Sequence, residues 1–273
     1  MRRDGSKPDD KPPLSAALAL LAMAVGIAAM KEAAKFVWLP GVGLRSLLVV
    51  SEVALAAPAL AMLLARLGVR AAVLGDMRLN ARMLITSAAA GVTLWVLSLG
   101  LFELQYSVWR PPPGYLEAFR FLHERLRPSG PLDALVSLAA IAAAPALCEE
   151  LVFRGVVLQS LVGSLGHAGA SLASATLFGL IHVDFTLYGE PSLYRVPFAF
   201  TVGLGFAALR LGSRSLLPPF VAHATLNAIT FAAAPFTDDP GAGLPAPRPL
   251  LGAAFFVVGL GLSMLPLRAL HHR

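Results

Sequence analysis

The sequence predicts an all-α integral membrane protein, a polytopic bundle of about eight transmembrane helices. Of its 273 residues, 57% are hydrophobic and only 14% are charged, whereas about a quarter of the residues in a soluble domain are charged. The mean hydropathy is +0.71. Apolar runs long enough for a hydrocarbon core of about 30 Å recur along the whole chain. A surface that faced water everywhere would need more charge, so this composition excludes an ordinary soluble fold.

Apolar runs separated by charged residues, or by proline and glycine, give the predicted membrane spans. In chain order they are residues 14–30, 47–65, 83–102, 132–162, 168–182, 196–211, 216–234 and 250–267. The fourth run is longer than a bilayer requires, so one long tilted helix and two shorter helices both remain open for it. The chain shows no repeat of fixed period.

The first predicted span, residues 14–30, follows a basic and proline-rich N-terminal tail, residues 1–13. A secretory signal peptide has a similar order, but it ends in a cleavage site made of small residues. This run instead ends in Met30, Lys31 and Glu32. We therefore expect it to be the first transmembrane helix.

The connection before the fourth span carries an amphipathic pattern. Tyr115, Phe119, Leu122 and Leu126 recur at steps of three and four, with charged residues between them. This spacing predicts a helix that lies in the membrane interface. We expect a connector that covers apolar surface, while a gate beside a functional site is the alternative.

The formal net charge of +6 does not indicate a nucleic-acid partner, because the 22 Lys and Arg residues are scattered among the loops. In a membrane protein such residues mainly set orientation and contact lipid headgroups. Their bias toward the loops on the side of the N-terminus predicts a cytoplasmic N-terminus. The many Ala, Gly, Pro and Arg residues suggest a GC-rich genome, so we expect the inner membrane of a bacterium.

The fourth span holds three charged residues, Glu149, Glu150 and Arg154. Each charge at the centre of a membrane helix costs about 2.5–3.5 kcal/mol, and such residues usually mark function. Glu150 and Arg154 are four residues apart, with the acid on the N-terminal side, which favours a pair along the helix. Glu149 is rotated from Glu150 by about 100°, so it is free to face elsewhere.

Two later spans also carry polar side chains. Phe178 and His182 are four residues apart in one span, and His223 and Asn227 are four apart in another. A structural ion cluster and packed histidines are the alternative interpretation. Polar groups on three apolar helices favour a functional site, because together they supply a base, proton carriers and an amide donor.

In this order the motifs CEELVFR, FGLIH and HATLN resemble those of the CPBP intramembrane proteases. That family includes the CAAX prenyl endopeptidases of Rce1 type and the bacterial Abi proteins. Its pattern is two adjacent Glu with Arg four after the second, then Phe with His four later, then His with Asn or Asp four later. The chain meets each part, and the resemblance covers about residues 132–234.

The resemblance implies a role for each motif residue. Glu149 is expected to be the general base that activates a water, assisted by His182. His223 and Asn227 are expected to stabilise the oxyanion of the tetrahedral intermediate, an effect worth about 3–4 kcal/mol in a dry cavity. The supporting residues that the motifs also carry are Glu150, Arg154 and Phe178.

The implied activity is that of an endopeptidase that hydrolyses a peptide bond of a membrane-anchored or lipidated protein or peptide. CAAX-type processing and removal of a C-terminal sorting signal, as by a myxosortase, both remain open. A small transporter or proton path, and a non-catalytic membrane scaffold, are the alternatives. The oligomeric state is not indicated.

The implied organisation is an N-terminal tail (1–13), N-terminal helices with the interfacial helix (14–131), a catalytic core (132–267) and a C-terminal tail (268–273).

No cofactor is expected, although zinc remains an alternative. Glu149, His182 and His223 would be its ligands, as in metalloproteases with two His and one Glu. No HExxH motif occurs to place two His on one helix. The lone cysteine, Cys148, is expected to be inert, because buried thiols rarely react. Glu52, in the second span, is expected to serve packing, with an interhelical contact or a substrate-cavity group as the alternatives.

Overall fold

The computed structural model describes residues 14–35, 43–65, 69–112, 124–183, 192–233 and 246–271. Across these residues the chain is helical and forms no strand, apart from an isolated bridge between Gly75 and Ser215. The predicted all-α class is therefore confirmed. The N-terminal tail and most of the predicted interfacial helix, with Tyr115, Phe119 and Leu122, lie outside the described residues.

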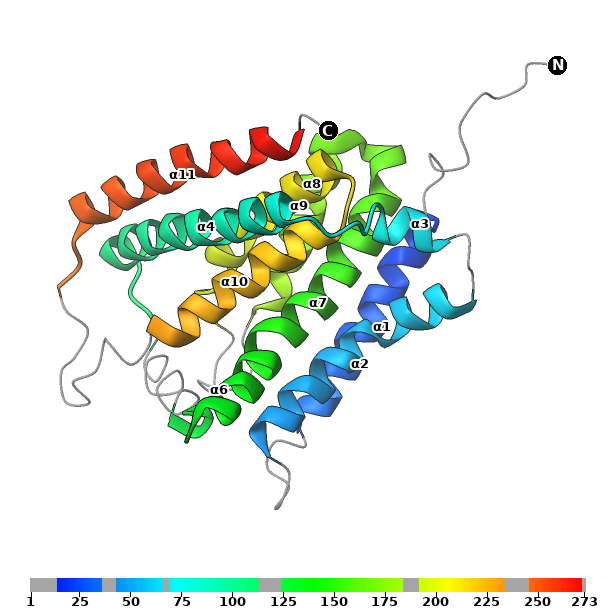
Figure 1. Ribbon diagram of the computed structural model, residues 1–273, viewed down its shortest axis with the longest axis horizontal. Coiled ribbons are helices and arrows are strands. Elements are labelled where there is room, and N and C mark those ends of the chain that lie inside the picture. Colours follow the sequence, from blue (N-terminus) through cyan, green and yellow to red (C-terminus); the bar gives the residue numbers. More distant parts are fainter. Residues whose placement is uncertain are drawn as a thin grey trace.

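The arrangement of the helices is shown in Figure 1. In chain order they are α1 (Ala16–Ala34), α2 (Leu44–Ala65), α3 (Val69–Leu74), α4 (Ala81–Val108), α6 (Pro131–Leu138), η3 (Ala139–Ala143), α7 (Ala144–Glu150), η4 (Leu151–Val157), α8 (Leu158–Ile181), α9 (Val196–Ser213), α10 (Leu217–Ala233) and α11 (Pro249–His271).

Six helical stretches within the described part of the chain are long and apolar enough to cross a membrane. They are α1, α2, α4, the continuous stretch from α6 to α8, α9, and residues 249–266 of α11. Each of the eight predicted spans coincides with a helical segment. The other two are α10, with 17 residues, and the part of α8 that follows a kink.

The stretch from Pro131 to Ile181 shows how the fourth and fifth predicted spans are joined. The helix runs through two π-helical segments, η3 and η4, which lie on either side of α7. It then kinks at Gly166, whose φ of 66° and ψ of 175° are not helical. Glycine adopts this positive φ without steric cost. The fourth span is thus one long helix, and its π turns are of a kind often found at functional sites.

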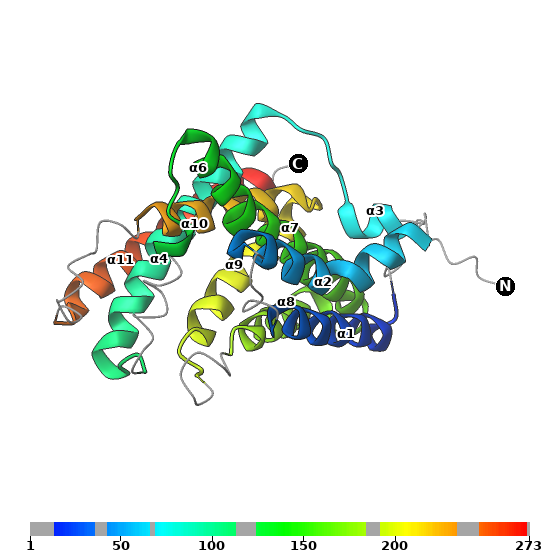
Figure 2. The same cartoon turned by 90° about the horizontal axis from the view of Figure 1, so that it is seen from below.

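The helices pack so that α7 lies in the middle of the bundle. It contacts α2 on one side and α10 on the other, and α10 also packs against α4 (Figure 1). Helices α1 and α2 form one pair and α4 and α11 another, at opposite sides of the molecule (Figure 2). The polar residues of the fourth span therefore lie among helices and not at the lipid surface.

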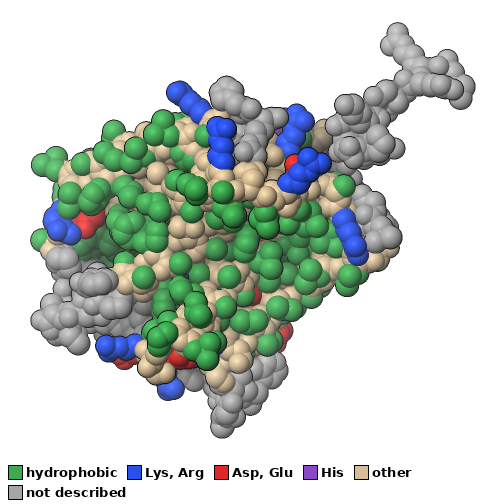
Figure 3. Space-filling model, in the orientation of Figure 1, with side chains coloured by type: hydrophobic (Ala, Val, Ile, Leu, Met, Phe, Trp, Pro, Cys, Tyr) green, Lys and Arg blue, Asp and Glu red, His purple; other side chains and the backbone are tan. Residues whose placement is uncertain are grey.

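The outer surface is apolar where a bilayer would contact it. Exposed side chains include Leu64, Val257 and Leu250, the last 88% exposed. On the face shown in Figure 3, hydrophobic side chains cover the centre and Lys and Arg lie toward the margins. Because helices satisfy their backbone hydrogen bonds internally, such a surface is stable in lipid. The chain is an integral membrane protein.

Candidate active site

The predicted pair between Glu150 and Arg154 is present at the junction of α7 and η4. Nη1 of Arg154 lies 3.0 Å from Oε1 of Glu150, and both side chains are fully buried. Nη2 of Arg154 donates to the carbonyl of Gly203 at 3.0 Å, which ties η4 to α9. A Cβ at Gly203 would lie 3.1 Å from that same Nη2. Glycine therefore leaves room for the guanidinium at this crossing.

His223 of α10 contacts both adjacent glutamates. Its Nδ1 lies 2.9 Å from Oε1 of Glu150, and its Nε2 lies 3.6 Å from Oε2 of Glu149. The first distance is a hydrogen bond, whereas the second exceeds one. The ring also stacks on Phe206, with centroids 4.6 Å apart. A buried hydrogen-bonded series thus runs from Arg154 through Glu150 to His223. Glu149 lies at the end of this series, and its carboxylate can accept a hydrogen bond from another donor.

Phe178 of α8 lies at the centre of the polar cluster. Its ring centroid is 4.3 Å from the guanidinium carbon of Arg154, close enough for a cation–π contact. The same ring lies edge-on to His182 at 4.9 Å and to His223 at 5.9 Å. Phe178 therefore positions the two imidazoles and covers the buried cation.

His182 caps the C-terminus of α8 and is half-buried. Its Nδ1 lies 2.7 Å from the carbonyl oxygen of Phe178. A carbonyl only accepts, so Nδ1 carries the hydrogen and the neutral ring presents Nε2 as an acceptor. The ring interacts electrostatically with His223 and Arg154. The second predicted histidine thus lies in the same cluster as the first.

Asn227 lies on α10 one turn after His223 and is half-buried. Residues four apart share a helix face, so the amide lies on the side of α10 that carries His223. In the described part of the chain, no hydrogen bond joins its side chain to the other site residues. The structure therefore brings Glu149, His182 and His223 into one cluster and places Asn227 along its edge.

Two charged residues interact with the cluster although the motifs do not contain them. Glu149 interacts electrostatically with Glu52 of α2 and with Arg195, the residue before α9. Glu52 also interacts with Cys148, and Arg195 with His182. Glu52 carries a sequence signal, since it is charged in the middle of an apolar span, although packing is its expected role. Arg195 carried no such signal, because it lies in a connection.

The expected ligands of the zinc alternative are Glu149, His182 and His223. In the described residues, no group of three or more His, Cys, Asp or Glu side chains is arranged to hold a metal ion. Both ring nitrogens of His223 face glutamates, and Nδ1 of His182 is bonded to a backbone carbonyl. Cys148 is buried. No step proposed below passes through a metal or a thiol.

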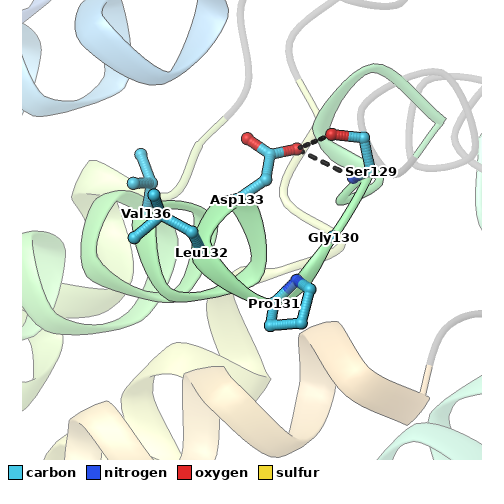
Figure 4. A pocket seen from close by; sticks show the side chains of 6 residues that line it. All are labelled: Ser129, Gly130, Pro131, Leu132, Asp133 and Val136. Carbon is cyan, nitrogen blue, oxygen red and sulfur yellow. Dashed lines mark hydrogen bonds between the residues drawn. The ribbon is translucent and has the colours of Figure 1, made fainter.

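A shallow pocket lies elsewhere, at the start of α6 (Figure 4). Its lining includes Asp133, which accepts hydrogen bonds from the backbone N–H of Ser129 at 2.8 Å and from its hydroxyl at 3.1 Å. Asp133 also pairs with Arg45 of α2. Asp133 precedes Glu149 by about four helical turns, or about 24 Å. This pocket therefore contains none of the predicted site residues.

Comparison with protein families finds a match that lies mostly in the second half of the chain. Residues 131–229 match the Rce1-like family, described as type II CAAX prenyl endopeptidase. No curated protein and no solved structure matches the chain. The matched residues begin at α6 and end in α10, and they include the three motifs. The match supports an intramembrane protease of CAAX type, which agrees with the resemblance found in the sequence.

Proposed function

We propose, from the Rce1-like domain at residues 131–229, that this chain is an intramembrane endopeptidase with a glutamate general base. Its substrate would be a membrane-anchored or lipidated protein or peptide, cut near its anchor. The observation that carries the proposal is the position of the Glu149 carboxylate. It lies at the end of the buried hydrogen-bonded series of Arg154, Glu150 and His223.

Glu149 activates the attacking water. Its nearest described partner, Nε2 of His223, lies beyond hydrogen-bond distance, so a carboxylate oxygen can accept from a water. Glu149 takes one proton as the water oxygen bonds to the carbonyl carbon of the scissile peptide. The free Nε2 of His182 is a second acceptor that orients the same water. The proton then passes to the leaving nitrogen as the C–N bond breaks.

His223 and Asn227 stabilise the oxyanion that forms when the water attacks. A carboxylate only accepts, so Nδ1–H of His223 donates to Glu150 and the ring has one orientation. Nε2 is then a donor toward the site in the imidazolium, in which both ring nitrogens carry a hydrogen. The amide of Asn227, one turn along α10, is a second donor. One such donor in a water-excluded site is worth about 10²–10³-fold in rate.

Glu150 and Arg154 keep this donor in place. Arg154 neutralises Glu150 and bonds to the backbone of α9, while Glu150 holds His223. A buried carboxylate without a cation would be costly, so the pair allows His223 to be oriented by a charge inside the membrane. These two residues act through His223 and do not touch the substrate.

The substrate class that the family name suggests is a CAAX-type protein, and C-terminal sorting signals are a related class. Both place the scissile bond close to a lipid or helix anchor. We further propose that the chain lies in the inner membrane of a bacterium with its N-terminus in the cytoplasm, because Lys and Arg are more numerous in the loops of that side.

The test is Glu149→Gln, which keeps the shape of the side chain and removes the base. Cleavage should fall by about 10²–10⁴-fold while insertion and thermal stability stay unchanged. The readout is the set of membrane-protein precursors that accumulate uncut in cells carrying the variant, compared with cells lacking the chain. Glu103→Gln is the matched control, because Glu103 pairs with Arg248 at the end of α4, away from the cluster. Normal processing by the Glu149 variant would remove Glu149 from the mechanism.

A further inference from the structure

Glu52 of α2 lies outside the Rce1-like domain but borders its site. Helix α2 packs against α7, and both ribbon views show the two helices side by side (Figures 1 and 2). The carboxylate of Glu52 interacts electrostatically with Cys148 and Glu149, the neighbouring residues near the end of α7. Glu52 therefore faces the catalytic carboxylate from the opposite helix.

The carboxylate of Glu52 has no neutralising partner in the described part of the chain. Its Oε2 is buried without a hydrogen-bond donor, while the residue as a whole is only half-buried. The other two glutamates differ, since Glu150 pairs with Arg154 and Glu149 lies beside His223. An acid inside the membrane is costly and is by default functional. Glu52 thus presents a carboxyl group without a described hydrogen-bond donor at the edge of the site.

The buried cation of the site is committed to other groups. Arg154 is fully buried on Glu150 and on the carbonyl of Gly203. Arg195 is exposed and interacts with Glu149 and His182. An anionic ligand would be repelled by Glu52 and Glu149, and an apolar ligand would leave Glu52 unpaired. The group that complements Glu52 is therefore a cation supplied by the substrate.

We infer that Glu52 is a specificity-determining residue, which accepts the ammonium or guanidinium of a substrate Lys or Arg next to the scissile bond. This inference rests on the proposed function. Lys and Arg have long apolar stems, so their charge can reach Glu52 while the stem lies on apolar surface. Both donate several hydrogen bonds to a carboxylate. Membrane-anchored proteins carry these residues at the ends of their spans, where a cut near the anchor would fall.

Binding of synthetic peptides tests this without cleavage. Each peptide has one Leu/Ala helix followed by an extended segment with a single Lys, whose position is moved one residue at a time. The reference peptides carry norleucine instead. Purified wild-type protein in detergent should bind the Lys peptide about tenfold more tightly at one position or two adjacent ones, as fluorescence anisotropy measures it.

Glu52→Gln should abolish this preference and leave the affinity for the norleucine peptide unchanged, whereas the control Glu103→Gln should keep the preference. If Glu52→Gln does not fold, Glu52→Asp should retain the preference for Lys, and Glu52→Lys should shift it to a peptide with Glu.

Three results would overturn the inference: equal binding of both peptides at every position, a preference that survives Glu52→Gln, or a preference that depends on Glu149 alone. Normal processing by Glu149→Gln, together with a preference that depends on Glu52, would instead reject the proposed function and keep the cation site.

Discussion

The α4–α11 pair and the cluster around α7 use apolar helices in opposite ways. Along α4 and α11, glycines let the backbones approach, because a Cβ at Gly100, Gly252 or Gly259 would collide with the partner helix. Around α7, fully buried charges on Glu150 and Arg154 join the helices. The sequences of both regions are similarly apolar, yet the helices of the first are joined by close backbone packing and those of the second by a buried ion pair.

The difference shows which contacts can be removed at a small cost in stability. In lipid, small residues stabilise helix pairs by packing, and each contact contributes little. A buried ion pair behaves differently, since removing one partner leaves an uncompensated charge and costs about 3–5 kcal/mol. We therefore expect single substitutions in the α4–α11 pair to lower stability by small, graded amounts. Removal of one charged partner in the cluster should lower it by a much larger step.

The largest effect is expected for Arg154→Met, which leaves Glu150 charged and unpaired. Stability should fall by about 3–5 kcal/mol, and cleavage should be lost because Glu150, which orients His223, loses its cation and the link to α9. Thermal unfolding in detergent measures the first effect. The matched control is the double variant Glu150→Gln/Arg154→Met, which should regain much of the stability because no charge is left buried. Equal destabilisation of both variants would show that shape, not charge, joins these helices.

A smaller effect is expected for Gly259→Leu, because a side chain there meets the backbone of Leu97 on α4. Overpacking should cost about 1–3 kcal/mol, while the proposed active site, which lies among other helices, should keep its activity. Gly261→Leu on the same helix is the control, since a Cβ at Gly261 has no heavy atom within 4 Å. If both variants were equally stable, close approach would not hold this pair together.

The smallest effect is expected at the hydroxyl contact between Ser263 of α11 and Thr93 of α4, 3.2 Å apart. Interhelical hydrogen bonds in membranes average about 0.6 kcal/mol. A double-mutant cycle with Ser263→Ala and Thr93→Ala should therefore give a coupling energy of this size. A coupling above about 2 kcal/mol would place this contact in the same class as the charged cluster and remove the contrast between the two regions.

Local features of the site could be predicted from the sequence, and contacts between distant segments could not. The pair of Glu150 with Arg154 followed from their spacing on one helix, and it is confirmed. The bond from His223 to Glu150 joins residues 73 apart, and no spacing rule predicts which glutamate a distant imidazole meets. The sequence places Glu52 in an apolar span, but helical spacing does not predict which residue it meets on a neighbouring helix.

The sequence by itself determined the membrane class, the positions of the apolar helices and the residues able to do chemistry, because hydropathy and helical spacing are local properties. Only the tertiary structure decided that one imidazole contacts both glutamates and that α2 brings a further acid to the site. The reason is physical: those relations depend on how helices pack across the bundle, and packing is set by side chains that are far apart in the chain.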